Sequence, residues 1–143
     1  MSRNYIYLAH PFNSRTKIKK FGDKLQKKLK RVRIVNPFYN EHTHEVFTKS
    51  DKSNADYYAK LNSKSIVESC LALISHSDYM VAVIDGALSY GTIQEIVYAN
   101  LWKIPVFIVC TNGQSEHPWL QYHASEMFTS YKALEEFLAN AEL

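Results

Sequence analysis

The sequence predicts an α/β fold built on a five-stranded, mostly parallel sheet. Short apolar runs rich in β-branched residues alternate with longer segments in which apolar side chains recur at helical spacing. The clearest unit is an apolar run over 79–84, a turn at Asp85-Gly86 and a helical pattern that starts at Thr92. In α/β proteins a loop between such a strand and helix is where ligands bind.

The individual elements follow from the chain in order. Strands are expected where a short apolar run is bounded by turn residues, at 4–9, 32–35, 79–84, 104–110 and 127–129. Helices are expected where apolar residues form one stripe, from Asn13 or Ser14 to about Lys30, over 55–75, from Thr92 past Leu101, and after Ser130. Residues 38–56 and 111–124 have no period, and the longer of these loops has the length of a functional lid.

The connections between these elements predict the topology. Right-handed crossovers place the strands in the order 2-1-3-4-5, with helices on both faces of the sheet. This is a single flavodoxin-like or Rossmann-like domain over residues 1–143. Its switch point lies between the first and third strands, so the loops 9–14 and 85–91 meet at the carboxyl edge, where we expect the chemistry.

Composition narrows the class of protein. A chain of 143 residues, 46% of them hydrophobic, can bury one core. Ten tyrosines suggest that some aromatic side chains face a ligand or a partner subunit. Cys70 and Cys110 lie in apolar surroundings and are expected to be reduced core residues. We find no signal peptide pattern and no apolar run as long as a membrane span, so we expect a cytoplasmic protein without a membrane partner.

The net charge of +3 is unevenly distributed. Ten of the 17 Lys and Arg residues lie between Arg15 and Arg33, where Asp23 is the only acid. They surround the apolar stripe of the first helix, and such a charge run is usually a solvated surface. The alternative is an electric field that attracts anionic ligands such as nucleotides. No nucleic-acid-binding motif accompanies the charge, so a nucleic acid partner is not expected.

Glu95 and Tyr7 each have two interpretations. Thr92 and Glu95 match a capping box, in which Glu95 only binds the backbone at the helix start. Alternatively, the carboxylate is kept ionised by the helix dipole and faces the crevice, where it suits nucleophilic attack on the anomeric carbon of a sugar. Tyr7, in the first strand, is either a core residue or a phenol that reaches this carboxylate.

Two further groups of polar residues lie in loops. Ser89 and the backbone amides of 90–92 can bind an anion at the helix start, although Ser89 also suits a simple turn. Ser14 and Arg15 add polar groups where the first helix begins. The cluster 41–45 contains two His and two Glu, but it lacks a third distant ligand fixed by spacing, so we predict no metal site.

Three segments carry a resemblance to a known family. Residues 6–12, 77–86 and 91–99, the last with the pattern Gly-x-x-x-Glu-x-x-x-Ala, resemble the nucleoside 2-deoxyribosyltransferases in order and spacing. The resemblance implies that Glu95 is the nucleophile and that Tyr7 positions it. It implies cleavage of the N-glycosidic bond of a 2-deoxyribonucleoside through a glycosyl–Glu95 intermediate, transfer of the sugar to a free nucleobase, no cofactor, and a place in nucleotide salvage. The expected substrate contacts lie at the carboxyl edge: Ala9, Pro11, Phe12, Ser14, Arg15, Asp85, Gly86, Ser89, Gly91 and Thr92.

Three positions depart from the family pattern. Ser89 stands where the transferases have an Asp for the nucleobase, and this is similar to the related 2-deoxynucleoside 5-phosphate N-hydrolases, where a Ser helps hold the phosphate. Cys70 stands where the family has an Asp that binds the sugar hydroxyl. The residue lent by a neighbouring subunit falls near His117, so the segment 117–122, with His117 and Trp119, is the candidate contact across a homodimer or larger homo-oligomer. The leading hypothesis is therefore a transferase, and the second is a 5-monophosphate hydrolase. The third is a non-catalytic nucleotide-binding or regulatory domain, which the Cys at position 70 favours.

Overall fold

The computed structural model describes residues 4–39, 63–87 and 89–143. The sheet contains five strands in the order β2-β1-β3-β4-β5, and all of its pairings are parallel. The predicted strand order is therefore confirmed. The strands are β1 Asn4–Ala9, β2 Val32–Val35, β3 Tyr79–Ile84, β4 Val106–Cys110 and β5 Glu126–Phe128.

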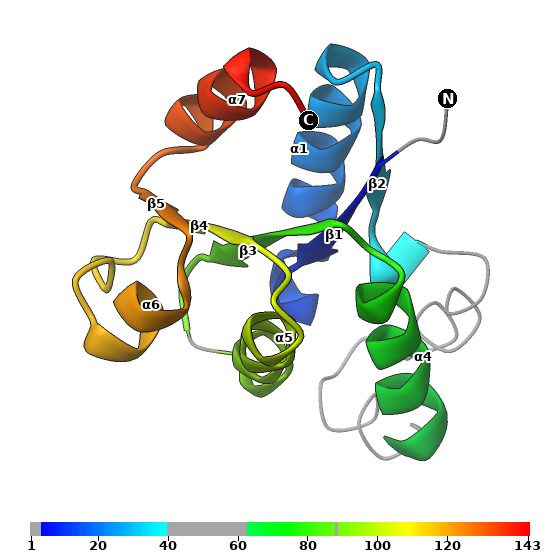
Figure 1. Ribbon diagram of the computed structural model, residues 1–143. Coiled ribbons are helices and arrows are strands. Elements are labelled where there is room, and N and C mark those ends of the chain that lie inside the picture. The colour runs from blue at the N-terminus through cyan, green and yellow to red at the C-terminus, as the bar shows by residue number, and fades with distance from the viewer. Residues whose placement is uncertain (1–3, 40–62, 88) are drawn as a thin grey trace.

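Helices cover both faces of the sheet (Figure 1). Helices α1 and α7 lie on one side, and α4, α5 and α6 lie on the other. The α-helices are α1 Arg15–Lys28, α4 Ser63–Ser75, α5 Tyr90–Leu101, α6 Pro118–His123 and α7 Tyr131–Asn140. Two short 3-10 helices, η1 Phe12–Ser14 and η2 Pro37–Tyr39, follow β1 and β2.

The alternation of side chains along the strands divides the core into two clusters. In β1, Ile6 and Leu8 pack against α1 and α7, whereas Tyr7 and Ala9 lie on the side of α4, α5 and α6. Because helices cover both faces, the strands are apolar throughout rather than alternating, as in other parallel sheets. The register therefore places Tyr7 on the same face of the sheet as helix α5.

Several predicted boundaries are wrong for local reasons. Helix α5 begins at Tyr90 rather than Thr92, and β4 begins at Val106 rather than 104, because the Ile104 amide donates to the Ala99 carbonyl at the end of α5. The stretch 111–124 is not wholly irregular, since it contains helix α6. A six-residue helix is too short to show an apolar period.

The other helix termini differ in smaller ways. Helix α1 ends at Lys28, and Ser14 occupies its N-cap position without a side-chain cap bond, because its backbone (φ −97°, ψ 7°) is not in the extended conformation of a capping residue. Ser130 caps α7 as predicted and accepts from the Ala133 amide at 3.2 Å. The expected start of the second helix at 55, and residues 40–56 of the expected loop, lie outside the described residues.

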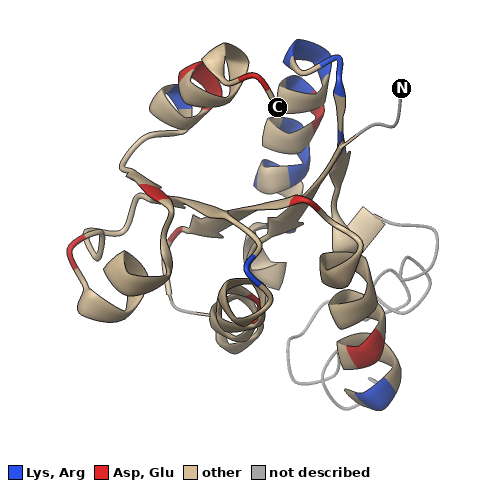
Figure 2. Ribbon diagram, viewed as in Figure 1, with Lys and Arg blue, Asp and Glu red and all other residues tan. Residues whose placement is uncertain are grey.

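The basic residues concentrate on α1 and the adjoining β2 (Figure 2). Three carboxylates pair with four of the α1 lysines: Lys17 pairs with Asp85, Lys19 with Asp23, and both Lys24 and Lys28 with Glu135 of α7. Part of this charge is therefore balanced within the protein. Within the described parts of the chain, no helix has the length and apolar character needed to cross a membrane.

Candidate active site

Tyr7 and Glu95 meet at the carboxyl end of the sheet, although they are 88 residues apart in the chain. Tyr7 is fully buried in β1, and its phenol hydroxyl donates a hydrogen bond to Oε2 of Glu95. Glu95 extends from α5 and is half-buried. The pairing of β1 with β3, which runs into the α5 loop, brings the two side chains onto one face of the sheet.

This environment shifts the ionisation of both groups. Burial raises the pKa of Glu95 from 4.5 to about 7, and the hydrogen bond from Tyr7 offsets this only in part. Burial, together with the charge of Glu95 and the neighbouring Cys70, raises the pKa of Tyr7 well above 10. Tyr7 therefore remains a hydrogen-bond donor, while Glu95 titrates near neutral pH, as catalytic carboxylates often do.

Two features expected of Glu95 are wrong, namely its part in a capping box and its ionisation by the helix dipole. Ser89, not Thr92, is the N-cap of α5, and its hydroxyl accepts from the Thr92 amide at 3.4 Å. Glu95 consequently lies beyond the first turn, where it neither completes a capping box nor gains much from the helix dipole. Its carboxylate binds Tyr7 instead, and burial favours its neutral form.

Glu95 lines a pocket of about 460 Å³ between α4 and α5. Helix α4 contributes Ile66, Val67, Cys70 and Leu71, so most of the apolar stripe predicted to face the core lines this pocket instead. Cys70 is thus a wall residue rather than a core residue. Burial and the nearby Glu95 raise the pKa of its thiol to about 12, so the thiol is neutral.

A second pocket of about 530 Å³ adjoins the first at the N-terminus of α5. Both pockets are lined by Phe12, Ser89, Tyr90 and Gly91, and the second also by Pro11. Thr92, which lines the first, is 1% exposed, and its hydroxyl has no hydrogen-bond partner among the described residues. Because the two pockets share these lining residues, one ligand can extend from the first into the second at this helix end.

Five of the ten contacts expected at the carboxyl edge do not line these pockets, namely Ala9, Ser14, Arg15, Asp85 and Gly86. Ala9 is fully buried in β1, and neither Ser14 nor Arg15 is among the lining residues. The guanidinium of Arg15 lies 3.8 Å from the centroid of the Phe12 ring, and its Nη1 donates to the Phe12 carbonyl at 3.0 Å. Arg15 therefore shapes the loop after β1.

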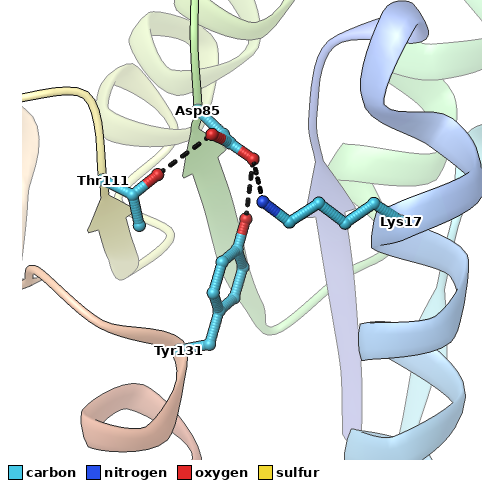
Figure 3. A network of polar contacts seen from close by, with 4 residues as sticks. All are labelled: Lys17, Asp85, Thr111 and Tyr131. Carbon is cyan, nitrogen blue, oxygen red and sulfur yellow. Dashed lines mark hydrogen bonds and ion pairs between the residues drawn. The ribbon is translucent and has the colours of Figure 1, made fainter.

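The Asp85 carboxylate, at the end of β3, binds side chains from three neighbouring segments (Figure 3). Asp85 pairs with Lys17 at 2.7 Å and accepts hydrogen bonds from Thr111 at 3.1 Å and Tyr131 at 3.2 Å. The hydrogen bond from Lys17 is the largest cause of the lowered pKa of Asp85. Gly86, with a φ of 76°, accepts from the Asn112 side chain at 2.9 Å. These contacts join the end of β3 to α1, β4 and α7, and they hold Asp85 and Gly86 in place.

Neither His117 nor Trp119 reaches the pockets within one chain. His117 caps α6 by accepting from the Trp119 amide at 3.2 Å, and Trp119 is 70% exposed. The cluster 41–45 lies outside the described residues, and the described ones contain no group of three potential metal ligands. His10, which the sequence did not single out, is buried and lines the first pocket.

Comparison with known proteins relates this geometry to a family. The family model described as nucleoside 2-deoxyribosyltransferase matches residues 6–131. The chain belongs to this family. Among curated protein sequences there is no match.

Solved structures support the fold assignment for this family member. A conserved protein from Enterococcus faecalis superposes with a TM-score of 0.72 at 18% identity, covering 96% of this chain and 98% of that one. A 2-deoxyribosyltransferase from Bacillus psychrosaccharolyticus superposes with a TM-score of 0.67 at 15% identity, covering 97% of this chain and 93% of that one. A CMP N-glycosidase from Clostridium botulinum superposes with a TM-score of 0.60 at 15% identity, covering 94% of this chain and 98% of that one. At these identities the likeness concerns the fold.

Proposed function

We propose that this protein cleaves the N-glycosidic bond of 2-deoxyribonucleosides and transfers the sugar to another nucleobase. Glu95 acts as the nucleophile, and Tyr7 positions it. The observation that carries the proposal is the hydrogen bond from the buried Tyr7 phenol to a carboxylate that lines a ligand-sized pocket, in a chain of the nucleoside 2-deoxyribosyltransferase family. The substrates are a nucleoside or nucleotide and a free nucleobase, and the chemistry needs no cofactor.

The proposed reaction has two displacements at the anomeric carbon. Tyr7 holds Oε2 of Glu95, which leaves Oε1 to attack the carbon. The electron pair of the carbon–nitrogen bond leaves with the first base, which takes a proton from water. A nitrogen of the second base then attacks the same carbon, releases the carboxylate and loses its own proton. A carboxylate with a pKa of about 7 is partly ionised at neutral pH and is more basic than an ordinary glutamate.

A second candidate is hydrolysis of 2-deoxynucleoside 5-monophosphates. The specific observation in its favour is the N-terminus of α5. There Ser89 and Thr92 lie beside two adjoining pockets, and the Thr92 hydroxyl has no hydrogen-bond partner in the described part of the chain. A helix N-terminus favours a phosphate group because its free amides and dipole both attract negative charge. In this case water, rather than a base, takes the sugar from Glu95.

Chromatography of the products separates these functions. The protein is mixed with a deoxynucleoside or its 5-monophosphate, with and without a second free base. Transfer predicts a new nucleoside that forms only when the second base is present. Hydrolysis predicts sugar 5-phosphate whether or not a base is added, and Ser89→Ala should then weaken turnover of the monophosphate more than that of the nucleoside. If no combination gives a product, both proposals are wrong and the non-catalytic domain is favoured.

We further propose that the protein works as a homo-oligomer in which the segment 117–122 of one subunit approaches the pocket of another. Helices α5 and α6 expose large apolar side chains, among them Tyr90 at 94%, Tyr122 at 76% and Trp119 at 70%. Sedimentation should therefore detect a species larger than the monomer. Mixing the variants Glu95→Gln and Trp119→Ala should restore activity, because a mixed oligomer contains one site with both native residues. Activity that stays at the level of the separate variants would contradict this arrangement.

A further inference from the structure

His10 is a buried side chain of the first pocket that the proposed mechanism does not use. It is 2% exposed. Its Nδ1 lies 3.0 Å from the Pro11 carbonyl oxygen, and its Nε2 lies 3.0 Å from Oδ1 of Asn36. The same Oδ1 accepts a hydrogen bond from the Phe38 amide at 3.1 Å, which identifies it as the oxygen of the Asn36 amide. Both ring nitrogens of His10 therefore face oxygen acceptors.

This arrangement is fully satisfied by only one protonation state. A neutral imidazole carries a single N–H, so either tautomer leaves a ring lone pair facing an oxygen. The imidazolium donates to both oxygens. Burial opposes the charge and lowers the pKa of His10, whereas the hydrogen bonds to Asn36 and Pro11 act in the opposite direction. An anion that enters the pocket would shift this balance toward the charged form.

The pockets hold few other charges. None of the described residues that line them is Lys or Arg. Arg15, which the sequence suggested as the partner of an anion, lies over the Phe12 ring instead. The titratable side chains that share the first pocket with His10 are Glu95, Cys70, Tyr90 and Tyr98, all of which are neutral or negative. Among the described lining residues, a positive side chain can therefore come only from His10.

We propose that His10 is a specificity-determining residue that selects a phosphorylated substrate by becoming an imidazolium when the 5-phosphate binds. The phosphate lies at the N-terminus of α5, near Ser89 and the Thr92 hydroxyl, for which residues 4–39, 63–87 and 89–143 supply no hydrogen-bond partner. One proton moves from solvent to His10 as the phosphate enters, and the two opposite charges attract each other across the pocket that both occupy. The inference rests on the proposed nucleotide site in the same pocket.

The test uses deoxyribose 5-phosphate, which carries the phosphate but has no glycosidic bond to break. Titration calorimetry between about pH 5.5 and 8, in two buffers of different ionisation enthalpy, gives both affinity and proton uptake. His10→Gln can keep a donor to Asn36 without the charge, and His10→Phe keeps a ring beside Phe38, whose centroid lies 4.8 Å away. The matched control is His76→Gln at the exposed end of α4.

We expect both His10 variants to bind about tenfold more weakly than wild type near pH 6, with the difference closing toward about pH 8. The phosphate of the ligand ionises in the same way in every experiment. The ratio of the wild-type affinity to the variant affinity at each pH therefore reports the effect of His10 alone. Wild type and the His76 variant should take up an extra proton on binding, and the His10 variants should not. Unfolding curves check that each variant is folded. If His10→Phe does not fold, the comparison of wild type with His10→Gln is sufficient.

An affinity ratio that does not change with pH, or proton uptake that persists in His10→Gln, would overturn the inference. So would an absence of binding to wild type at every pH. Failure of the proposed function gives a different result. In that case pH-linked binding through His10 persists, but neither deoxynucleosides nor their monophosphates yield product.

Discussion

Replacing Tyr7 by Phe removes one hydroxyl and leaves the packing of the ring in the core intact. That hydroxyl donates to Oε2 of Glu95, and the hydrogen bond favours the ionised carboxylate. A hydrogen bond to a charged group contributes about 1.5–3 kcal/mol. Each 1.4 kcal/mol or so corresponds to a tenfold change in an ionisation constant.

The wild-type carboxyl has a pKa of about 7, so close to half of the protein carries the nucleophilic form at neutral pH. Without the Tyr7 hydroxyl, the pKa of Glu95 should rise further. We expect the ionised fraction, and with it kcat/KM, to fall about tenfold or more near pH 7. Loss of orientation would lower the rate further, and this part should persist at high pH.

The assay is the pH dependence of kcat/KM for glycosidic cleavage by wild type and Tyr7→Phe. The rising limb, which reports ionisation of the nucleophile, should move to higher pH in the variant. Recovery of the wild-type plateau at high pH would assign the whole effect to ionisation, whereas a lower plateau would add an orientation effect. Superimposable profiles with unchanged stability would refute the positioning role and make Tyr7 a core residue only.

Three further predictions concern stability. The pKa of Glu95 is raised from 4.5 to about 7 in the folded state, so wild type should lose stability as pH rises through this interval. In thermal unfolding experiments, the Glu95→Gln variant should not show this loss of stability. Asp85→Asn removes the partner of Lys17 and should cost about 1–2 kcal/mol near neutral pH. Because the folded pKa of Asp85 is lowered, this difference in urea unfolding should shrink as pH falls below 3.8. Gly22→Ala would place a Cβ 3.1 Å from Cδ2 of Leu8. We expect the free energy of unfolding, measured in urea, to fall by about 1 kcal/mol. A gain in stability would show that α1 can shift away from β1.

The strand order was predictable because the sheet is covered on both faces. Strands buried on two sides read as unbroken apolar runs, and crossover handedness then restricts their order. The same logic did not reveal helix α6, which is too short to show a period and is marked only by the cap residue His117 and by Pro118 at its first turn. Boundaries set by single hydrogen bonds, such as that of Ile104 to Ala99, leave no pattern in the sequence.

Only those residues of the candidate site that belong to a sequence motif could be predicted. The spacing around Glu95 and the strand position of Tyr7 singled out both residues, and the structure places them in contact, but the burial that raises the pKa of Glu95 depends on tertiary packing. The apolar stripe of α4 could not be assigned to the pocket, because core and pocket walls have the same composition. The role of His10 depends on Asn36, which lies 26 residues away.

In the proposed mechanism, Glu95 becomes covalently bonded to the sugar. The most direct measurement is mass spectrometry of the protein after it is mixed with a deoxynucleoside or its 5-monophosphate, without a second base, and quenched in acid. We predict one added deoxyribosyl group, with or without its phosphate, on the peptide that contains Glu95, and neither adduct nor turnover in Glu95→Gln. Near-normal turnover by Glu95→Gln, or product formation by wild type with the sugar bonded to a different residue, would contradict the mechanism.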